Sequence, residues 1–540
     1  MKNLFKNYKL KVTTIAPVHV GDGEQYEPTN YVIDDGYLYF FKDSDLILSL
    51  SKEQKNELLK IVSKTNSYRQ IQLFYKRKDI QNIAKEISLY RVEVSKSIED
   101  NYNQALGRVR QKEGNKEVLN ALSINTTIKS NNIPYIPGSS FKGSLKTAFY
   151  SFESKNKRFQ DVVKEKTKFN RKTKQKVFKD YEFNSNYFGK FEEDPFYKIK
   201  VSDLITNRPE LQVKWCVNKK KKSFDTDNDN TAVRFEFLKP YSEYFCELTL
   251  WDNIQNNELN KINSKIRDQK KQLKQPNRNY SIDEIIKITN DFYIPKFLEE
   301  YKWAKERKQL ISQEYFNIAL KYINNAKNGK GFILRVGQHS GAVSMTLDKH
   351  RKIFIPQMKD VNNIKDKYVD SPFTYWLASN VDEVKNSEFI GWIYCELISD
   401  KIYNDILQQV LEYQKKFYEK KKEIEKKLYE KITLESNKIK EKVLKEQQKR
   451  EEEEQRLKKE QEEKKAKLAS MTPAQRLIEE YSDIAVLIND MKSGKIENFE
   501  EIKIELAQEI KKILQQNPKT WDKAKKKALD RRNYIEGLLK

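Results

Sequence analysis

Alternating apolar and polar residues predict that much of the first 400 residues is β-structure. Residues 8–15 alternate with a period of two, which is the pattern of a half-buried strand. Residues 31–41 form two such runs around Asp35-Gly36, a dipeptide that favours a two-residue hairpin turn. A glycine-rich loop, residues 17–23, joins the first strand to this hairpin. Further strands are expected within residues 120–129, 196–250, 331–337 and 389–397.

Three stretches interrupt this β pattern. Residues 43–118 are rich in Lys and Glu with helical periodicity, which indicates a helical insertion. Residues 282–327 begin at a capping box, Ser281-Ile282-Asp283-Glu284, and are long enough for two helices. Residues 151–190 are dense in Lys and Arg, which predicts a basic segment that is either mobile or helical.

The character of the chain changes after about residue 400. Residues 445–467 consist almost entirely of Lys, Glu, Gln and Arg, so we predict a charged helical stalk over residues 401–470. Thr472-Pro473-Ala474-Gln475 combines a capping box with Pro at the first helical position, and a three-helix module is expected over residues 471–540. A heptad-like series of apolar residues marks the start of the stalk: Ile406, Val410, Tyr413, Phe417 and Ile424.

The amino-acid composition favours a polyanionic binding partner. The formal net charge is +25 and the pI is about 9.4, so nucleic acid or acidic lipid would be attracted. Alternatively, the surface lysines serve only to keep the protein soluble. No stretch approaches a membrane span, and the first residues lack the apolar run of a signal peptide. We therefore expect a cytoplasmic protein without membrane contact.

Cysteine and histidine are too scarce for most metal and redox chemistry. Cys216, Cys246 and Cys395 lie far apart, which argues against a disulfide framework or a zinc knuckle. The chain has 3 histidines, and no pair of them has the spacing of metal ligands. No metal site and no cofactor are therefore expected.

The most informative segment runs from residue 133 to residue 148. A short β-prone run meets a Gly-Ser-Ser turn, and an amphipathic helix follows that carries Lys142 and Lys146 four residues apart. A glycine turn at a helix N-terminus presents free N–H groups to an anion, so this segment is a candidate phosphate-binding site. A plain strand-turn-helix junction is equally compatible. The segment lacks the Gly-Lys-Ser/Thr ending of a P-loop, so nucleotide hydrolysis is not suggested.

Other loops repeat the combination of glycine or serine with a basic side chain at the end of a β segment. They are residues 19–23, residues 335–341 and the shorter His350-Arg351. Glycine lets a phosphate backbone approach the main chain, and basic groups neutralise it, so the set is typical of a groove for single-stranded RNA. The predicted RNA-binding residues are His19, Gly21, Gly138, Ser139, Ser140, Lys142, Gly143, Lys146, Arg335, Gly337, His339, Ser340 and Arg351.

Several of these segments resemble one family. Residues 136–148 are similar to the signature of the RAMP superfamily of CRISPR-associated RNA-binding proteins, and residues 15–23 and Ser202-Asp203 resemble other parts of its pattern. Residues 334–346 resemble one subgroup, the fifth subunits of type III-A Csm effector complexes. Residues 374–378 and 389–392 look like the C-terminal end of that subgroup. The resemblance covers residues 8–397 in order.

The resemblance implies an α+β fold with two ferredoxin-like (RRM-related) halves. The first half would span residues 1–250, with the insertion at 43–118, and the second residues 251–400, with the helices at 282–327. It implies a non-catalytic subunit that caps one end of a CRISPR effector on the guide RNA and assists guide maturation in antiviral defence. The implied partners are guide RNA, other RAMP subunits of a Csm-type complex and host nucleases.

Two alternatives stay open. Some members of the superfamily are endoribonucleases, and His19 or Asp22 would then be the candidates for cutting guide RNA. A lone Asp beside glycine is more commonly a turn former. The other alternative is a scaffold that acts mainly through helix contacts made by residues 400–540.

Overall fold

The computed structural model describes residues 4–64, 68–113, 116–119, 122–170, 175–184, 194–227, 229, 232–251, 256–268, 272–274, 278–355, 368–516, 521 and 526–540. The chain forms two compact units, Met1–Lys431 and Ile432–Lys540, which we call the body and the C-terminal unit. None of the helices in the described residues has an apolar stretch of the length that crossing a membrane requires.

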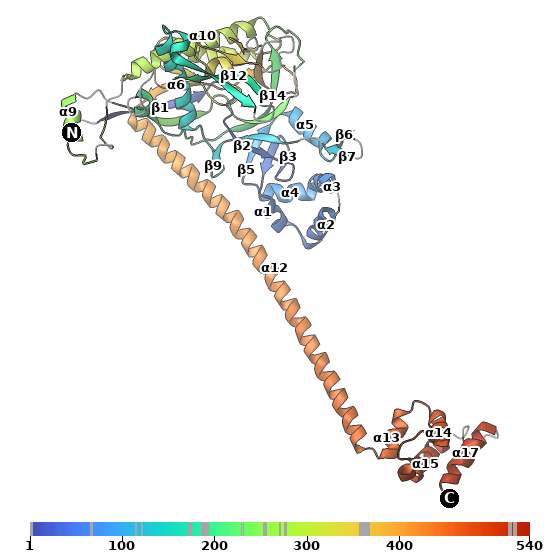
Figure 1. Cartoon of the computed structure of the whole chain (residues 1–540). Coiled ribbons are helices and arrows are strands. Elements are labelled where there is room, and N and C mark those ends of the chain that lie inside the picture. The colour runs from blue at the N-terminus through green and yellow to red at the C-terminus, as the bar shows by residue number, and fades with distance from the viewer. Residues whose placement is uncertain are drawn as a thin grey trace. The chain divides into compact units, whose positions relative to one another are not determined.

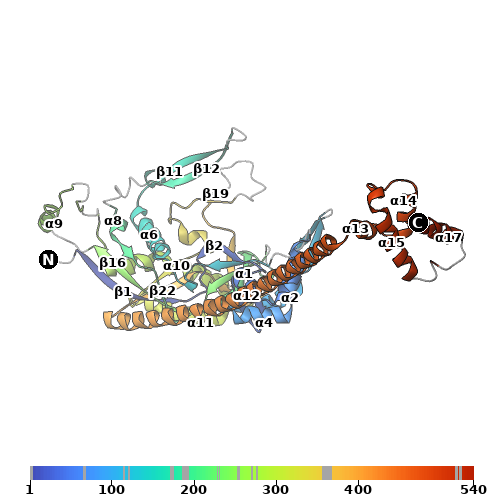
Figure 2. The same ribbon diagram turned by 90° about the horizontal axis from the view of Figure 1, so that it is seen from below.

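The first sheet of the body is antiparallel and draws its strands from the whole length of the body. Its strand β1 is labelled in Figure 1, and β1, β16 and β22 are labelled in Figure 2. Its central strand β1 pairs with β16 on one side and with β22 on the other. Within the described residues the order is β13 (Lys200–Val201), β16 (Glu243–Trp251), β1 (Phe5–Thr14), β22 (Trp392–Ile398) and β17 (Phe332–Arg335).

This strand order decides how the body is divided. The expected boundary at residue 250 is not one, because β1 and β16 precede it, β17 and β22 follow it, and all four lie in one sheet. The mixed α and β character is confirmed. The description as two ferredoxin-like halves stays a prediction.

The second sheet contains the predicted hairpin of residues 31–41. Its turn residues Asp35 and Gly36 have φ of +52° and +76°, as a two-residue hairpin turn requires. The strands of this sheet are β2 (Gly21–Tyr26), β8 (Ile124–Thr127), β15 (Val233–Leu238), β14 (Leu211–Lys220), β5 (Tyr90–Val94), β4 (Tyr37–Phe40) and β3 (Tyr31–Asp34), with β20 (Thr374–Ser379) on β14 and β21 (Glu388–Phe389) on β20. Two pairs, β14 with β5 and β15 with β8, are parallel.

The insertion at 43–118 is only partly helical. It holds α1 (Asp43–Ser49), α2 (Lys52–Val62), α3 (Tyr68–Tyr75), α4 (Lys78–Glu86) and α5 (Lys96–Ala105), but also β5 and the hairpin of β6 (Val109–Glu113) and β7 (Lys116–Leu119). Strand β5 pairs with β4 and β14, so the insertion is built into the second sheet rather than attached to it.

Two long helices pack against the first sheet. Helix α6 (Gly138–Ser154) buries Phe141, Leu145 and Phe149, and it contacts α10 (Ile282–Lys305) and β17. The predicted capping box at Ser281 and Glu284 begins α10, and α11 (Gln313–Lys327) follows, so both expected helices are confirmed. Smaller elements of the body are α7 (Phe159–Val162), α8 (Pro195–Lys198), α9 (Asn256–Asn263), β9 (Lys129–Ser130), β10 (Ile133–Pro134), β18 (Ile353–Phe354) and β19 (Tyr368–Val369).

The basic segment at 151–190 is not helical over most of its described part. It forms an antiparallel hairpin of β11 (Val163–Asn170) and β12 (Gln175–Phe183) (Figure 2). The register places Lys164 opposite Glu182, and the Lys166 ammonium forms an ion pair with the Glu182 carboxylate. Such cross-strand charge pairs favour a hairpin, and counting the lysines alone missed them.

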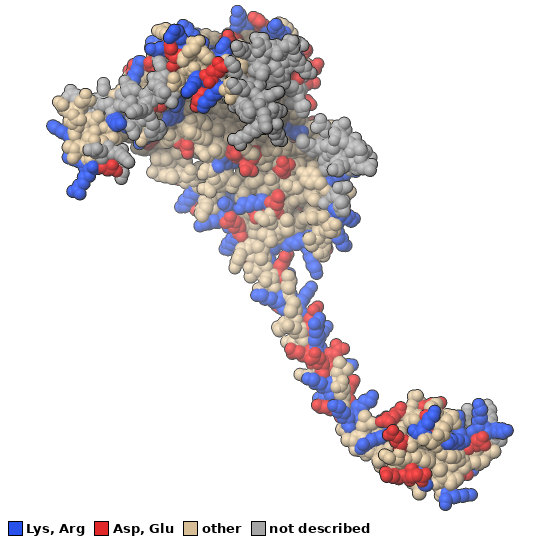
Figure 3. Space-filling view, viewed as in Figure 1, with Lys and Arg blue, Asp and Glu red and all other residues tan. Residues whose placement is uncertain are grey.

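The stalk is one helix, α12 (Asp400–Ser470), and its first turns belong to the body. Tyr403, Val410, Ile424 and Leu428 are buried there, and of these Val410 and Ile424 belong to the predicted heptad-like series. Basic and acidic side chains are interspersed along the rest of α12 (Figure 3). The end of the chain has four helices within the described residues, not three: α13 (Pro473–Glu480), α14 (Ile484–Lys492), α15 (Phe499–Gln516) and α17 (Lys526–Leu538). Asp483 caps α14 through the N–H of Ala485 (2.7 Å), so α14 begins as a helix separate from α13.

Candidate functional site

Three of the loops singled out in the sequence line a single groove of the body. Its volume is about 460 Å³, and its walls come from the start of β2, one face of α6 and the loop after β17. More than 100 residues separate each of these segments from the next along the chain. Six of the predicted site residues line it: Gly21, Ser140, Gly143, Arg335, Gly337 and Ser340.

The first sheet brings these loops together. The backbone N–H of Val336 donates to Gly391 O (2.8 Å), and that of Gln338 donates to His19 O (2.8 Å). Gly337 has a φ of +84°, and a Cβ on it would lie 2.2 Å from His19 O. Only glycine therefore allows the loop after β17 to lie against the loop after β1.

One face of α6 forms a wall of the groove. Ser140, Ser144 and Thr147 recur at helical spacing along this face, and Gly143 lies among them. The Ser144 hydroxyl donates to Arg335 O (2.7 Å), which fixes the helix to the end of β17. The prediction named Ser140 and Gly143 but missed Ser144 and Thr147, although their spacing from Ser140 was visible in the sequence.

Lys142 and Lys146 do not line this groove. They occupy another face of α6, where the Lys146 ammonium lies 3.9 Å from the Asp194 carboxylate. Burial lowers the pKa of Lys142, and the nearby charges of Lys146 and Lys200 act in the same direction while Asp194 opposes them. Any phosphate contact of these lysines would therefore be made on a surface separate from the groove.

The N-terminus of α6 is already occupied by an acidic side chain. The Gly138 N–H donates to Asp203 Oδ1 (2.9 Å), and a Cβ on Gly138 would lie 2.5 Å from Val201 O. The phosphate-binding site that the sequence suggested at this terminus is corrected, because Asp203 accepts there instead. Ser139, the next residue of the helix, is exposed.

Arg335 lines the groove but its guanidinium is committed to protein groups. The residue is 5% exposed, forms an ion pair with buried Glu300, and donates from Nε to Ile390 O (2.9 Å). Glu300 also accepts from Trp392 Nε1 (2.8 Å), and the guanidinium lies 4.9 Å from the centre of the Trp392 ring. The predicted phosphate contact by this arginine is therefore corrected to a structural role in holding the loop after β17.

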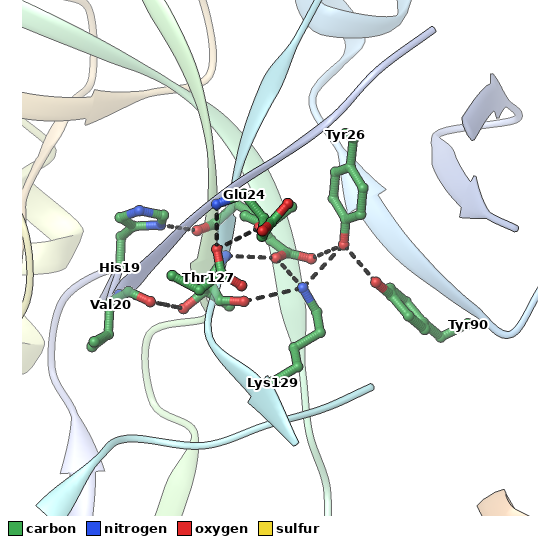
Figure 4. Close-up of polar contacts among 10 residues, drawn as sticks. His19, Val20, Glu24, Tyr26, Tyr90, Thr127 and Lys129 are labelled. Atoms are coloured by element: carbon green, nitrogen blue, oxygen red, sulfur yellow. Dashed lines mark hydrogen bonds and ion pairs between the residues drawn. The ribbon is translucent and has the colours of Figure 1, made fainter. Parts of the chain in front are cut away.

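His19 is a core histidine beside a buried polar cluster (Figure 4). Its Nδ1 donates to Glu236 O (2.7 Å), and burial lowers its pKa. The fully buried Glu236 carboxylate forms an ion pair with Lys129 and accepts from Tyr26 (2.6 Å) and from the Thr127 N–H (2.9 Å). His19 therefore does not line the groove, and its carbonyl oxygen holds the loop after β17 by accepting from the Gln338 N–H.

His339 packs in a row of aromatic rings beside the groove. Its ring centre lies 5.1 Å from that of Phe235 and 4.7 Å from that of Trp376, and its φ is +59°. Burial lowers the pKa of His339 to about 4. The imidazole is therefore neutral at pH 7, which corrects its expected role as a cationic phosphate contact.

Arg351 lies outside the groove. Its guanidinium pairs with Asp348 (2.6 Å) and donates to the Thr346 hydroxyl (2.9 Å). Asp22, the alternative catalytic residue, accepts from the Thr126 hydroxyl (2.8 Å) and from the Glu24 N–H (3.0 Å), as a turn-forming Asp does. In the part of the chain that the structure describes, no three His, Cys, Asp or Glu residues cluster in a way that could hold a metal ion.

The family model of the RAMP superfamily matches residues 11–340. The chain belongs to the RAMP superfamily. The predicted resemblance is thus confirmed, and the match includes the groove residues from Val20 to Ser340, while Ser344 and Met345 lie beyond it.

This RAMP protein is similar to two curated relatives that are both called "CRISPR system Cms protein Csm5". The one from Streptococcus thermophilus is 27% identical over 150 residues, which cover 27% of this chain and 39% of the relative. The one from Methanocaldococcus jannaschii is 26% identical over 249 residues, which cover 43% of this chain and 54% of the relative. The matched stretches thus span about half of each relative's length or less.

Two solved structures are also similar. The crystal structure of T. onnurineus Csm5 is 15% identical, with a TM-score of 0.39, and the match covers 71% of this chain and 99% of that one. A chain of the cryo-EM structure of the Csm–crRNA–target RNA ternary complex of a type III-A CRISPR-Cas system is 15% identical, with a TM-score of 0.40, covering 73% and 100%.

Proposed function

We propose that this chain is an RNA-binding subunit of a type III CRISPR effector of the Csm type, and that the groove beside α6 holds part of the guide RNA. The observation that carries the proposal is the convergence of loops from three distant parts of the sequence on one groove. Glycine backbone, hydroxyls and an amide line it, and these groups contact the backbone and sugars of nucleic acids.

Family and charge support the proposal. The curated relatives are named as Csm5 proteins of CRISPR systems. Residues 432–540 hold 26 Lys and Arg against 22 Asp and Glu, so most of the net charge of +25 lies in the body, where the groove is. Counterion release would then bring RNA to the body, and the groove would hold it.

Gly143 offers a direct test, because it is exposed on α6, lines the groove and has no atom within 4 Å of where its Cβ would be. Gly143→Glu places bulk and a negative charge in the groove while favouring the helix by about 0.5 kcal/mol. We expect RNA affinity of the purified chain to fall by at least about tenfold, which is about 1.4 kcal/mol, because the Glu side chain obstructs the groove and like charges brought together cost several kcal/mol. Fluorescence anisotropy with a labelled guide RNA measures it.

The matched control is Gly537→Glu, which makes the same change at an open helical glycine of the C-terminal unit. It should bind RNA as the parent chain does. If Gly143→Glu also binds like the parent chain, the groove is not the RNA site. A circular dichroism spectrum unchanged in both variants excludes misfolding as the cause.

We propose a non-catalytic role over the endoribonuclease alternative. The His19 ring is buried and directed at a carbonyl oxygen, and Asp22 is engaged in a turn. Incubating the chain with repeat RNA, with and without Mg²⁺, tests this. Specific cuts that disappear in Asp22→Ala would favour the enzyme.

A role in guide maturation through other subunits and host nucleases, and a cytoplasmic location, stay predictions. The scaffold alternative is tested by truncation after Lys431, not near residue 400, because Tyr403, Val410, Ile424 and Leu428 pack against the body. We expect the truncated body to be incorporated into the effector complex. Loss of incorporation would favour the scaffold.

A further inference from the structure

The groove is lined by neutral hydrogen-bonding groups, several of which have no hydrogen-bond partner among the described residues. The hydroxyls of Ser140, Ser340 and Ser344 and the Gln338 amide make no hydrogen bond within the part of the chain that the structure describes. Ser344 is the most informative of them, since it is 2% exposed and its Oγ is buried without a partner. A buried hydroxyl without a partner costs stability, and a ligand group that bonds to it would remove that cost. Ser344 differs from the other buried hydroxyls without a partner, such as that of Ser387, because it lines the groove.

The same lining lacks an available positive charge. All residues that line the groove are described, and among them Arg335 is the one with an ionisable side chain. The buried Glu300 carboxylate neutralises it. A phosphate here would be desolvated without a countercharge, which is unfavourable. A group that both donates and accepts hydrogen bonds without carrying charge fits these hydroxyls and this amide better.

We infer that the groove binds the ribose 2′-hydroxyl of single-stranded RNA, so that it distinguishes RNA from DNA, with Ser344 among the groups that read it. The 2′-hydroxyl is the donor and acceptor by which a protein tells the two polymers apart. This inference rests on the proposed function, because it names the chemical group of the RNA that the same groove recognises. The phosphates would then be held by positive charge elsewhere on the body.

The test compares one labelled single strand made as RNA, as DNA and as 2′-O-methyl RNA. We expect the full chain to bind RNA about tenfold or more tightly than either analogue, and the ratio to change little with salt because the reading groups are neutral. Ser344→Ala should reduce the RNA-to-DNA ratio by about 2- to 13-fold, the worth of one ordinary hydrogen bond, and leave DNA affinity unchanged.

Ser387→Ala is the matched control. Ser387 is also fully buried with an unpartnered hydroxyl, but it lies outside the groove lining. Both variants should keep or raise the thermal midpoint, because each removes an unsatisfied buried group. Only Ser344→Ala should alter the RNA-to-DNA ratio.

The outcomes separate this inference from the proposed function. If the parent chain binds neither RNA nor DNA, the proposed function fails. If it binds RNA and DNA equally, the groove does not recognise the ribose 2′-hydroxyl. The same conclusion follows if Ser344→Ala and Ser140→Ala both leave the RNA-to-DNA affinity ratio unchanged. In both cases the proposal of RNA binding stands.

Discussion

Replacing Arg335 separates a structural arginine from a phosphate contact. Arg335→Ala removes the partner of the Glu300 carboxylate, which is 4% exposed and would keep only Trp392 as a hydrogen-bond donor. Breaking a buried ion pair by removing one partner costs about 3–5 kcal/mol. With a urea m-value of about 3 kcal/mol/M or more for a unit of this size, the unfolding midpoint should fall by about 1 M.

Tryptophan fluorescence during urea unfolding is a suitable assay. Of the 6 tryptophans only Trp521 lies beyond the body, so the signal reports mainly the unit that contains the pair. In Glu300→Gln/Arg335→Met both charges are absent, and most of the lost stability should return, because replacing a buried pair by uncharged groups is commonly neutral.

The pH dependence gives a second readout. Burial raises the pKa of Glu300, and Arg335 opposes that rise, so Arg335→Ala should raise the pKa further. A carboxyl group whose pKa is higher in the folded state than in the unfolded state stabilises the fold while it is protonated. This stabilisation is lost as the pH rises through the pKa of the folded state. The destabilisation by Arg335→Ala should therefore shrink as pH falls toward the folded-state pKa of Glu300.

The refuting result is specific. If Arg335→Ala unfolds at the parent's urea concentration yet loses RNA affinity and reduces its salt dependence, then Arg335 contacts phosphate and the structural role is wrong.

Three further predictions concern residues around the groove. Asp203→Ala should lower stability by about 1 kcal/mol in urea unfolding by uncapping α6, and an unchanged midpoint would contradict the cap. Lys129→Met should cost about 3 kcal/mol in thermal unfolding by leaving the Glu236 carboxylate unpaired, whereas adding Glu236→Gln should restore part of it. Folding lowers the pKa of His339 to about 4. The neutral imidazole therefore contributes at most about 3 kcal/mol to the free energy of unfolding above pH 6.5, and this contribution is lost as pH falls toward 4. His339→Gln should flatten this part of the pH profile, and an unaltered profile would contradict the burial of the imidazole.

Local signals in the sequence were sufficient for many elements. The hairpin at Asp35-Gly36 and the helix starts at Ser281 and Thr472 were predicted correctly, because each depends on hydrogen bonds between residues a few positions apart. The hairpin of β11 and β12 was missed because a count of lysines does not show which residues of the two strands lie opposite one another. The boundary at residue 250 was wrong because strand order joins segments that are distant in the chain.

The sequence by itself determined the family and the loops that form the candidate site. It could not show which side chains of those loops are available, because this depends on burial and on partners far away in the chain. Arg335 is neutralised by Glu300, and the α6 terminus is capped by Asp203. Only the tertiary structure placed Gly21, Ser140 and Gly337 around one groove, since the sheet that joins them is made from both ends of the body. The physical reason is that the hydrogen bonds of helices and turns join residues that are close in sequence. Burial and charge pairing depend on residues that come close only in the folded chain.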